Sequence, residues 1–443
     1  MIGKFLSLEP EEYASFVSKL KLANQRFNAF NFIDESEKKG KIISVKDNIC
    51  VKGMPATASS KILQGYVPGF NATVVERLEG SGFSVIGKTN MDEFGFGSFG
   101  LNSDNPAKNP FDEQYVAGGS SSGSAVATAL IKEHVSIAES TGGSISAPAA
   151  FCGVVGLTPT YGIMSRYGLI DYASSLDKIG FMGKSSANIR EVMEKTVGSD
   201  PRDTTSLSTK ISNKNQHNLY IIDNLMQGVD EGIKDRFEDL LAKLSALSYK
   251  VEHVKIDYLE YSVPAYYILS MSEASTNLAK YQGFKYGFKI KDFSLNYNEF
   301  FMSARKQFGK EAKRRVILGT FIRSKSIKQK YYEKALAIRH AIISRMAKVL
   351  RDGFIIMPTM PIFTPKISEV SDINPVEAYS MDMLTVPPNL CGFPHMSFPY
   401  FYEKGMPLGA QLITDHFNDY SLLDFLSEWE SGFDYKFKEE IGQ

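Results

Sequence analysis

Residues 117–159 read AGGSSSGSAVATALIKEHVSIAESTGGSISAPAAFCGVVGLTP, and this stretch decides the fold. Its two Gly/Ser clusters, at 118–124 and 141–144, bracket apolar runs with the character of packed structure, which argues against a flexible linker. The first cluster leads directly into a run of small, helix-forming residues. The second lies between an apolar strand at 135–138 and a short helix at 145–150. The stretch therefore predicts helix and strand in alternation, joined by tight corners.

The second corner carries a candidate nucleophile. Ser144 follows Gly142 and Gly143, and Pro148 suits the first turn of the next helix. Glycines at a strand-to-helix corner let successive backbone N–H groups converge on one point, where the positive end of the helix also favours an anion. The oxyanion of an acyl-transfer reaction needs such donors. Ser144 therefore lies at a corner suited to acyl transfer.

A serine hydroxyl needs a base to become a nucleophile, and Lys46 is the best candidate. The six histidines lie in no setting that marks them as partners; they are His134, His217, His253, His340, His395 and His416. Lys46 ends the apolar run at 42–45, where a charged lysine is costly unless it is paired or neutral. A lysine whose pKa is lowered by burial can act as a neutral base near pH 7.

Together, three segments resemble the amidase signature family. They are VKDNI around Lys46, GGSSSGS with Ser120, and TGGSISAPAAFCGVVGLTPTYG with Ser144. The resemblance implies a Lys–Ser–Ser triad in which Ser144 forms the acyl-enzyme, Ser120 is the bridging serine and Lys46 is the base. It also implies an oxyanion hole built from the backbone N–H groups of Thr141, Gly142, Gly143 and Ser144.

The chain departs from the usual family pattern at three positions. The family commonly has aspartate before Thr-Gly-Gly-Ser and arginine two residues after the serine, whereas this chain has Ser140 and Ser146. Loss of an acid and a base together suggests that neutral hydrogen bonds replace a supporting ion pair. Ser122 stands where a glycine is usual. These departures bear on the rigidity of the loop more than on its chemistry.

The remaining pattern predicts an α/β protein: one large domain, residues 1–443, whose central mixed sheet is covered by helices on both faces. Its catalytic core is expected at about 41–185, and the rest completes the sheet and the substrate pocket. An N-terminal amphipathic helix is expected at 9–24, with Tyr13, Phe16, Leu20 and Leu22 toward one side. A strand–helix–strand unit at 219–256 predicts an additional parallel layer, and residues 161–177 are expected to line the active-site mouth.

Composition excludes several classes of protein. The 443 residues hold 50 basic and 50 acidic side chains, and this balance argues against tight, independent binding of nucleic acid. The three cysteines, Cys50, Cys152 and Cys391, lack metal-ligand spacing and fit reduced thiols in a cytoplasmic protein. No metal site is expected. The N-terminus does not resemble a signal peptide, and no apolar run is long enough for a membrane span.

Two glycine motifs are weaker candidates. Residues 95–100 match G-x-G-x-x-G, but a dinucleotide site needs a preceding hydrophobic strand and a following helix, and loop residues follow here. Residues 119–123 match the G-x-S-x-G elbow of α/β-hydrolases, yet no strand approaches them. A basic run at 313–315, continued by Lys325, Lys328 and Lys330, is interpreted as a solvated helix face, with a tRNA-facing patch as the alternative.

Outside the triad, the chain resembles the glutaminase A subunits of tRNA-dependent amidotransferases over nearly its whole length. The blocks that carry this likeness are SRYGLIDYASSLD, YYILSMSEASTN, KRRVILGTF and MDMLTVPPNLCGFP. A pocket for free glutamine needs a guanidinium for the α-carboxylate and a carboxylate for the α-ammonium. The matching positions are Arg315 and Asp382, with Tyr266 as a third. From the residues alone, a helix-surface ion pair is the favoured interpretation of Arg315, and a helix cap that of Asp382.

The resemblance implies L-glutamine as substrate and a heterotrimer completed by B and C subunits. No cofactor is expected in this chain; ATP and Mg²⁺ are expected on the partner protein, which would also hold most of the misacylated tRNA. The alternatives are a stand-alone amidase of the same family acting on small amides, and a non-catalytic scaffold that has kept the fold. The triad residues count against the scaffold.

Overall fold

The structure, a computed structural model, describes residues 4–214, 216–291, 294–436 and 441. Its strands are β1 Ser7–Leu8, β2 Phe30–Ile33, β3 Gly40–Lys46, β4 Phe83–Thr89, β5 Val135–Ser140, β6 Val155–Thr158, β7 Lys178–Gly183, β8 Asn218–Ile222, β9 Lys250–Val254, β10 Phe354–Pro358, β11 His395–Glu403 and β12 Met406–Ile413. Within the described residues all of them join one 12-stranded sheet, in the order β2-β4-β3-β5-β7-β6-β11-β12-β10-β8-β9, with β1 paired to β3. Parallel and antiparallel pairs both occur along this order, so the expected mixed sheet is confirmed.

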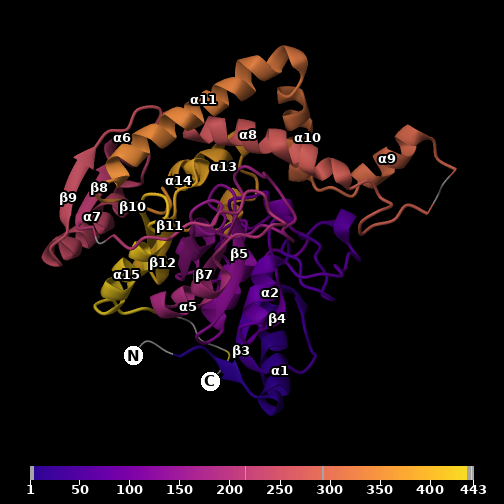
Figure 1. The fold of residues 1–443 in the computed structure, drawn as a ribbon, viewed down its shortest axis with the longest axis horizontal. Coiled ribbons are helices and arrows are strands. Elements are labelled where there is room, and N and C mark those ends of the chain that lie inside the picture. The colour runs from indigo at the N-terminus through magenta and orange to yellow at the C-terminus, as the bar shows by residue number, and fades with distance from the viewer. Residues whose placement is uncertain (1–3, 215, 292–293, 437–440, 442–443) are drawn as a thin grey trace.

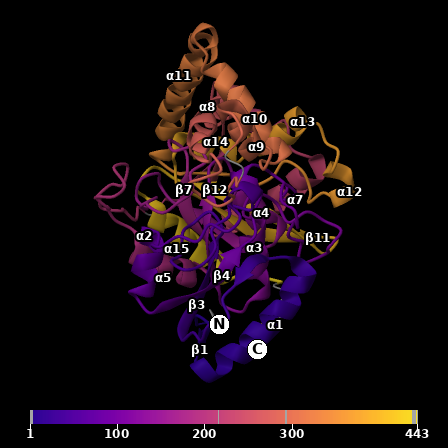
Figure 2. The same ribbon diagram turned by 90° about the vertical axis from the view of Figure 1, so that its right-hand side faces the viewer.

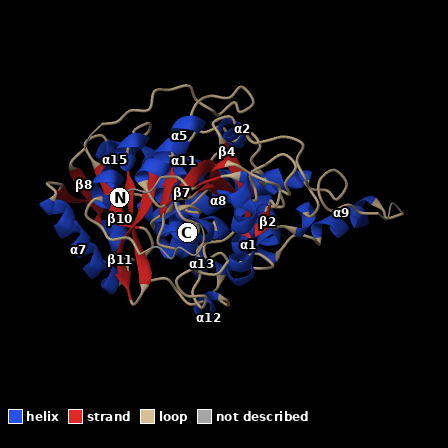
Figure 3. Cartoon of the chain, turned by 90° about the horizontal axis from the view of Figure 1, so that it is seen from below, coloured by secondary structure: helices blue, strands red, loops and turns tan. Residues whose placement is uncertain are grey.

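The helices cover the sheet on both sides (Figure 3). They are α1 Pro10–Phe27, α2 Thr73–Glu79, α3 Ser122–Leu130, α4 Ser146–Phe151, α5 Ser186–Thr196, α6 Asp223–Met226, α7 Glu231–Ala246, α8 Ser262–Asn277, α9 Tyr297–Arg305, α10 Lys310–Ile322, α11 Lys325–Leu350, α12 Ile367–Val370, α13 Pro375–Ser380, α14 Val386–Cys391 and α15 Asp419–Glu430. None of the helices in the described ranges combines the length and apolar content that a membrane span requires.

Successive side chains of β3 point to opposite faces of the sheet and pack into two different hydrophobic cores. Ile42 points into the core that α1 and α3 share, whereas Ile43 and Val45 point into the core beneath α2 and α5. Successive strand residues face opposite sides, so a continuous apolar run can fill both cores only when helices cover both faces. Polar side chains in this strand are therefore buried as well, and Lys46 is among them.

Helix α1 forms as its sequence predicts, with one correction. Pro10 opens it, and Glu9 and Glu12 form a capping box. Tyr13, Phe16 and Leu20 are buried, but Leu22 is 68% exposed. Each residue turns a helix by about 100°, so Leu22 lies almost opposite Leu20, and the expected placement of Leu22 on the apolar side was wrong.

The two strands of the β8–α7–β9 unit are parallel, as expected. They do not form a separate layer beside the main sheet. β8 pairs in parallel with β10 and with β9, and so extends the same sheet to its edge. Leu219 and Ile221 of β8 are buried, which requires that strand to lie within the sheet.

A layer of helices lies across the sheet in Figure 1, where α8, α10 and α11 run side by side, and Figure 2 shows the same helices from the side. Helix α8 packs against α10, α11 and α14. In this layer α8 carries Tyr266 and α10 carries Arg315, while Asp382 lies in the 3-10 helix Met381–Met383.

Candidate active site

The structure brings Lys46 and Ser120 together across 74 residues of chain, with Lys46 Nζ 2.9 Å from Ser120 Oγ. Lys46 is the last residue of β3, and both side chains are fully buried. Ser120 lies in the turn before α3, where its carbonyl oxygen accepts a hydrogen bond of 3.0 Å from the backbone N–H of Asp92. The first link of the expected proton path is therefore present in the structure.

Lys46 also has a partner that sequence reasoning did not find. Its Nζ lies 2.9 Å from Oε2 of Glu139 and 3.0 Å from the backbone carbonyl of the same residue. Asn48 Nδ2 donates a second hydrogen bond to Glu139 Oε2, at 3.2 Å. The cost of burying a lysine at the end of an apolar strand is offset here by pairing. An acid in the apolar run before Thr-Gly-Gly-Ser was the signal that could have revealed this partner.

Ser144 lies beside this group, on the corner between β5 and α4, and is 7% exposed. The turn that carries Ser120 rests on the same corner, because the Ser121 N–H donates to the Ser144 carbonyl at 3.2 Å and the Ser121 hydroxyl donates to the Glu139 carbonyl at 3.1 Å. Among the described residues, no hydrogen bond joins the hydroxyls of Ser120 and Ser144. That second link of the proton path stays a prediction.

The backbone N–H groups around Gly142 and Gly143 are available as hydrogen-bond donors, and their role as an oxyanion hole stays a prediction. Within the described part of the chain, no group accepts a hydrogen bond from the N–H groups of Gly142, Gly143 or Ser144. Thr385 Oγ1 donates to the Gly142 carbonyl at 3.0 Å. Because the C=O and N–H of a trans peptide point in opposite directions, this bond turns the Gly143 N–H away from Thr385. Three donors are thus left free beside the Ser144 side chain.

Side chains could not replace hydrogen at these two glycines. A Cβ on Gly142 would lie 2.4 Å from the Tyr266 ring, and one on Gly143, where φ is +147°, would lie 2.4 Å from Thr385 Oγ1. Tyr266 therefore packs directly on the loop. The sequence named Tyr266 as a substrate-binding residue; its position over Gly142 puts it in the first layer around the candidate nucleophile.

Arg315 is buried inside an aromatic cage and does not lie on the surface of α10. Its guanidinium carbon is 4.9 Å from the centre of the Phe96 ring and 5.3 Å from that of Tyr267. Its Nε donates to Glu311 Oε1 at 2.8 Å, and Nη1 donates to the Tyr172 hydroxyl. The expectation that the basic run at 313–315 is a solvated helix face is therefore wrong for Arg315, which is 3% exposed. Lys313 is exposed, as expected.

Asp382 faces the same cage through Tyr267. Its Oδ2 accepts hydrogen bonds from the Tyr267 hydroxyl at 2.6 Å and from Ser98 Oγ at 3.0 Å. Burial raises the pKa of Asp382 to about 6, although both hydroxyls and the nearby Arg315 favour the carboxylate and limit the rise. Tyr267 therefore contacts both the Arg315 guanidinium and the Asp382 carboxylate, the two charged groups that are expected from the sequence to bind glutamine. The helix-cap alternative for Asp382 does not account for these two bonds.

The triad group and the Arg315 cage are neighbours. A methyl group placed on Gly95 would lie 3.6 Å from Ser120 Oγ and 3.9 Å from the Tyr172 ring, and the hydroxyl of Tyr172 contacts Arg315. A cavity of about 480 Å³ opens beside Arg315, and its lining includes Ser98, Glu311 and Tyr379. Arg315 therefore lines this cavity and also contacts Tyr172, whose ring lies close to the Ser120 side of the site.

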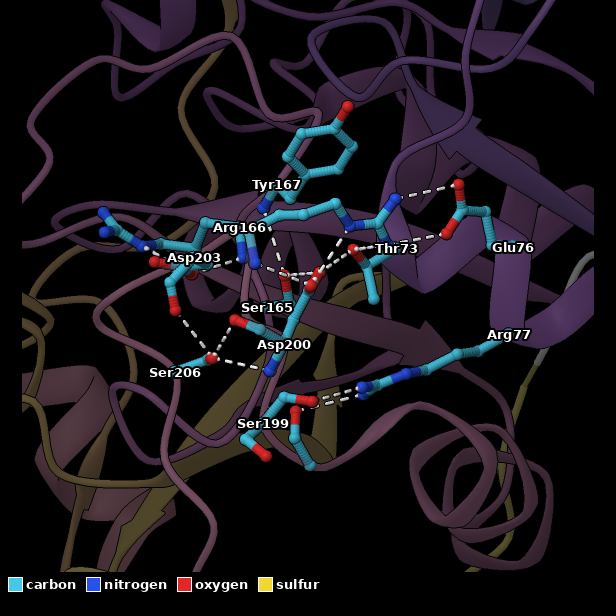
Figure 4. Close-up of polar contacts among 12 residues, drawn as sticks. Thr73, Glu76, Arg77, Ser165, Arg166, Tyr167, Ser199, Asp200, Asp203 and Ser206 are labelled. Carbon is cyan, nitrogen blue, oxygen red and sulfur yellow. Dashed lines mark hydrogen bonds and ion pairs between the residues drawn. The ribbon is translucent and has the colours of Figure 1, made fainter.

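Only part of the expected mouth segment, residues 161–177, reaches the site. Tyr172 does so, while the residues around Arg166 are tied to the loop that follows α5. Ser165 donates to Asp200 at 2.8 Å and the Arg166 N–H donates to Asp203 at 2.7 Å. Figure 4 shows how these residues lie together. These bonds fasten the segment to a second loop, so this half of it supports the site and does not line it.

The three departures from the family pattern have different surroundings. Ser140 Oγ donates to Asn389 Oδ1 at 3.1 Å, a neutral hydrogen bond of the kind expected. Ser146 is buried, and its hydroxyl has no hydrogen-bond partner among the described residues, so the expectation does not hold there. Ser122 begins α3.

Neither weaker glycine motif has the surroundings that it requires. A 3-10 helix, Glu93–Gly95, precedes residues 96–100, and loop residues follow them. No strand leads into residues 119–123, because β4 ends at Thr89 and α3 starts at Ser122. The dinucleotide and hydrolase-elbow alternatives are thus without structural support.

Sequence reasoning missed Glu139, Thr385, Tyr172 and Tyr267 as members of this group. Tyr267 directly follows the tyrosine that was chosen, and helical geometry about α8 alone could not tell which of the two faces Asp382. Thr385 lies three residues after Asp382, and only the packing of α14 on the Gly142 loop shows its contact.

This arrangement matches a known class of enzyme. A family model described as Amidase matches residues 22–423, and the chain belongs to that family. It is similar to proteins named as the A subunit of Glutamyl-tRNA(Gln) amidotransferase. The one from Pseudothermotoga lettingae is 38% identical and the match covers 96% of this chain and 94% of the relative. For that from Sulfolobus acidocaldarius the identity is 37%, with 94% of each covered.

Solved structures agree with these relatives. The crystal structure of the Glutamyl-tRNA(Gln) amidotransferase A subunit from Thermotoga maritima superimposes with a TM-score of 0.81 at 33% identity, covering 98% of this chain and 94% of that one. A crystal structure described as an amidase gives a TM-score of 0.80 at 26% identity, covering 96% of this chain and 97% of that one.

Proposed function

We propose that this chain is the glutamine-hydrolysing A subunit of a tRNA-dependent amidotransferase, acting in protein synthesis. The observation that carries the proposal is the contact between Lys46 Nζ and Ser120 Oγ, 2.9 Å long, beside the Ser144 loop. Near-complete coverage of relatives named as the A subunit of Glutamyl-tRNA(Gln) amidotransferase supports the particular role.

The chemistry follows from the side chains. Ser144 attacks the side-chain carbonyl of glutamine and loses its proton through Ser120 toward Lys46. The free N–H groups of the Thr141 to Ser144 loop stabilise the oxyanion. The C–N bond then breaks, ammonia leaves, and water hydrolyses the γ-glutamyl ester. Hydrolysis by this route needs no cofactor in the chain.

The Arg315 cage supports glutamine as the substrate. A guanidinium pairs with the α-carboxylate of a free amino acid, and the ionised Asp382 pairs with the α-ammonium. Arg315 is held by Glu311 and by the Tyr172 hydroxyl, so its position is set before a ligand binds. A small neutral amide would use neither charge, and this difference separates glutaminase from the stand-alone amidase.

The role of an A subunit extends the proposal to partners. The B and C subunits would complete a heterotrimer, with ATP and Mg²⁺ on the partner that activates the misacylated tRNA and uses the ammonia. The acceptor would be Glu-tRNA(Gln), Asp-tRNA(Asn) or both. The equal numbers of acidic and basic residues in this chain agree with tRNA being held mainly by a partner, in the cytoplasm.

The test is glutamate release from L-glutamine by the purified chain, with and without its partner subunits. Ser144→Ala should abolish release, because Ser144 carries the acyl group in the proposed reaction. Ser146→Ala is the matched control: the hydroxyl is also buried, lies two residues away and has no hydrogen-bond partner in the described structure, so turnover should stay close to that of the unmodified chain. Glutamate release that survives Ser144→Ala would refute the assignment, and equal hydrolysis of propionamide would favour the stand-alone amidase.

A further inference from the structure

Glu139 occupies an unusual place for a carboxylate in an enzyme whose base is lysine. It is 1% exposed, and its Oε2 lies 2.9 Å from Lys46 Nζ. The three neighbours of Nζ are Ser120 Oγ, Glu139 Oε2 and the Glu139 carbonyl, which together take up all three hydrogens of an ammonium. Lys46, which would receive a proton from Ser120, is therefore already in contact with the Glu139 carboxylate, a second group that can accept a proton.

The other oxygen of Glu139 belongs to a second buried pair. The Thr141 hydroxyl lies 2.6 Å from Glu139 Oε1 and 2.8 Å from Asp177 Oδ1. One hydroxyl hydrogen cannot serve two carboxylate oxygens, so one of the two acids must carry a proton of its own. Burial and the charge of Glu139 raise the pKa of Asp177 well above its ordinary value. Asp177 is then the acid to which we assign the proton: it donates to Thr141, Thr141 donates to Glu139 Oε1, and the other oxygen of Glu139 faces Lys46.

Building on the proposed hydrolysis, we propose that Glu139 is the positioning residue that receives the Ser144 proton through Lys46. Lys46 gives one Nζ proton to Glu139 Oε2 and takes the proton of the Ser120 hydroxyl. Ser120 takes the proton of Ser144 as the Ser144 O–H bond breaks and a bond forms to the amide carbon. The proton returns along the same path to the nitrogen that leaves as ammonia. No electrons are exchanged with any other group, and the lysine is neutral only during the transfer.

The surroundings of Glu139 bear on its pH dependence. Lys46 and Asn48 contact it from β3 and the turn after β3, and Thr141 and Asp177 contact it from the other side. Asp92 interacts with Lys46, and Arg166 interacts with Asp177. Lys46 is the only cation in direct contact with the Glu139 carboxylate among the described residues. The enzyme should therefore stay active at a pH where an isolated lysine base would be fully protonated.

The test follows acylation of Ser144 by a neutral fluorophosphonate across pH 5–10, together with kcat at saturating glutamine. Neither quantity depends on binding of the substrate ammonium by Asp382. In Glu139→Gln, Lys46 must itself lose a proton before it can accept one, so the acidic limb of both profiles should move up by about one pH unit or more. The rate should recover toward that of the unmodified chain at high pH. Glu139→Asp keeps an acid and should leave the limb in place while lowering the rate.

The possible outcomes distinguish the proposed role of Glu139 from the proposed hydrolase activity. An acidic limb that does not move in Glu139→Gln, with a normal thermal melting curve, would overturn the role of Glu139 while leaving Ser144 as the nucleophile. Absence of labelling at Ser144 in the unmodified chain would instead refute the proposed hydrolase. If Glu139→Gln does not fold, Glu139→Ser removes the acid with a smaller side chain and carries the same expectation.

Discussion

Thr385 offers a direct test of how the oxyanion loop is held. Its hydroxyl donates to the Gly142 carbonyl at 3.0 Å, and its side chain packs against Gly143. Valine has nearly the same shape but no donor, so Thr385→Val keeps the packing and frees the peptide between the two glycines. The lost bond is worth about 1 kcal/mol of stability, and the freed peptide no longer fixes the direction of the Gly143 N–H.

The expected kinetic effect is larger than the effect on stability. Loss of one oxyanion donor costs about 10²- to 10³-fold in kcat. Thr385→Val disorders such a donor without removing it, so we expect kcat to fall about 10- to 100-fold, or about 1.4 to 2.7 kcal/mol of transition-state stabilisation. The KM for glutamine should change little, because the oxyanion exists only after attack.

The assay is steady-state glutamate release with the partner subunits present, and urea unfolding gives the stability. Thr196→Val is the matched control, since Thr196 is also buried and its hydroxyl donates to a backbone carbonyl, that of Val192 in α5, at 2.8 Å. Both variants should lose similar stability, and only Thr385→Val should lose turnover. If the kcat of Thr385→Val is within about threefold of that of Thr196→Val, the reasoning about the loop is wrong.

Two further predictions concern the substrate pocket. Arg315→Lys removes a planar donor from its aromatic cage and should lower kcat/KM for glutamine about 10- to 100-fold, mainly through KM. The control is Lys313→Arg, at an exposed position on the same helix, which should stay within about twofold, and equal KM values for the two variants would contradict the role of Arg315. Because the pKa of Asp382 is about 6 and only its carboxylate pairs with the ammonium, KM should rise as the pH falls through 6. Tyr267→Phe removes a bond that favours the carboxylate, so the rise should begin at higher pH, and a KM profile that does not shift would exclude this pairing.

The sequence determined much of the secondary structure and predicted which groups react. Apolar runs buried on both faces required a sheet with helices on each side, and β3 and β5 lie where the apolar runs at 42–45 and 135–138 predicted. The family resemblance predicted the triad of Lys46, Ser120 and Ser144, and the Gly/Ser corner at Ser144 was informative because such corners are constrained by local backbone geometry. Such local constraints can be read from a few neighbouring residues.

Tertiary structure alone decided which side chains surround those groups. Glu139 and Thr385 contact the site from segments far apart in the chain, and their roles depend on how β5 pairs with its neighbours and how α14 packs on a loop. The sequence also could not place β8 and β9 in the same sheet, because strand pairing depends on hydrogen bonds between distant backbones. Burial and electrostatic pairing depend on the three-dimensional environment, and local sequence patterns specify that environment only in part.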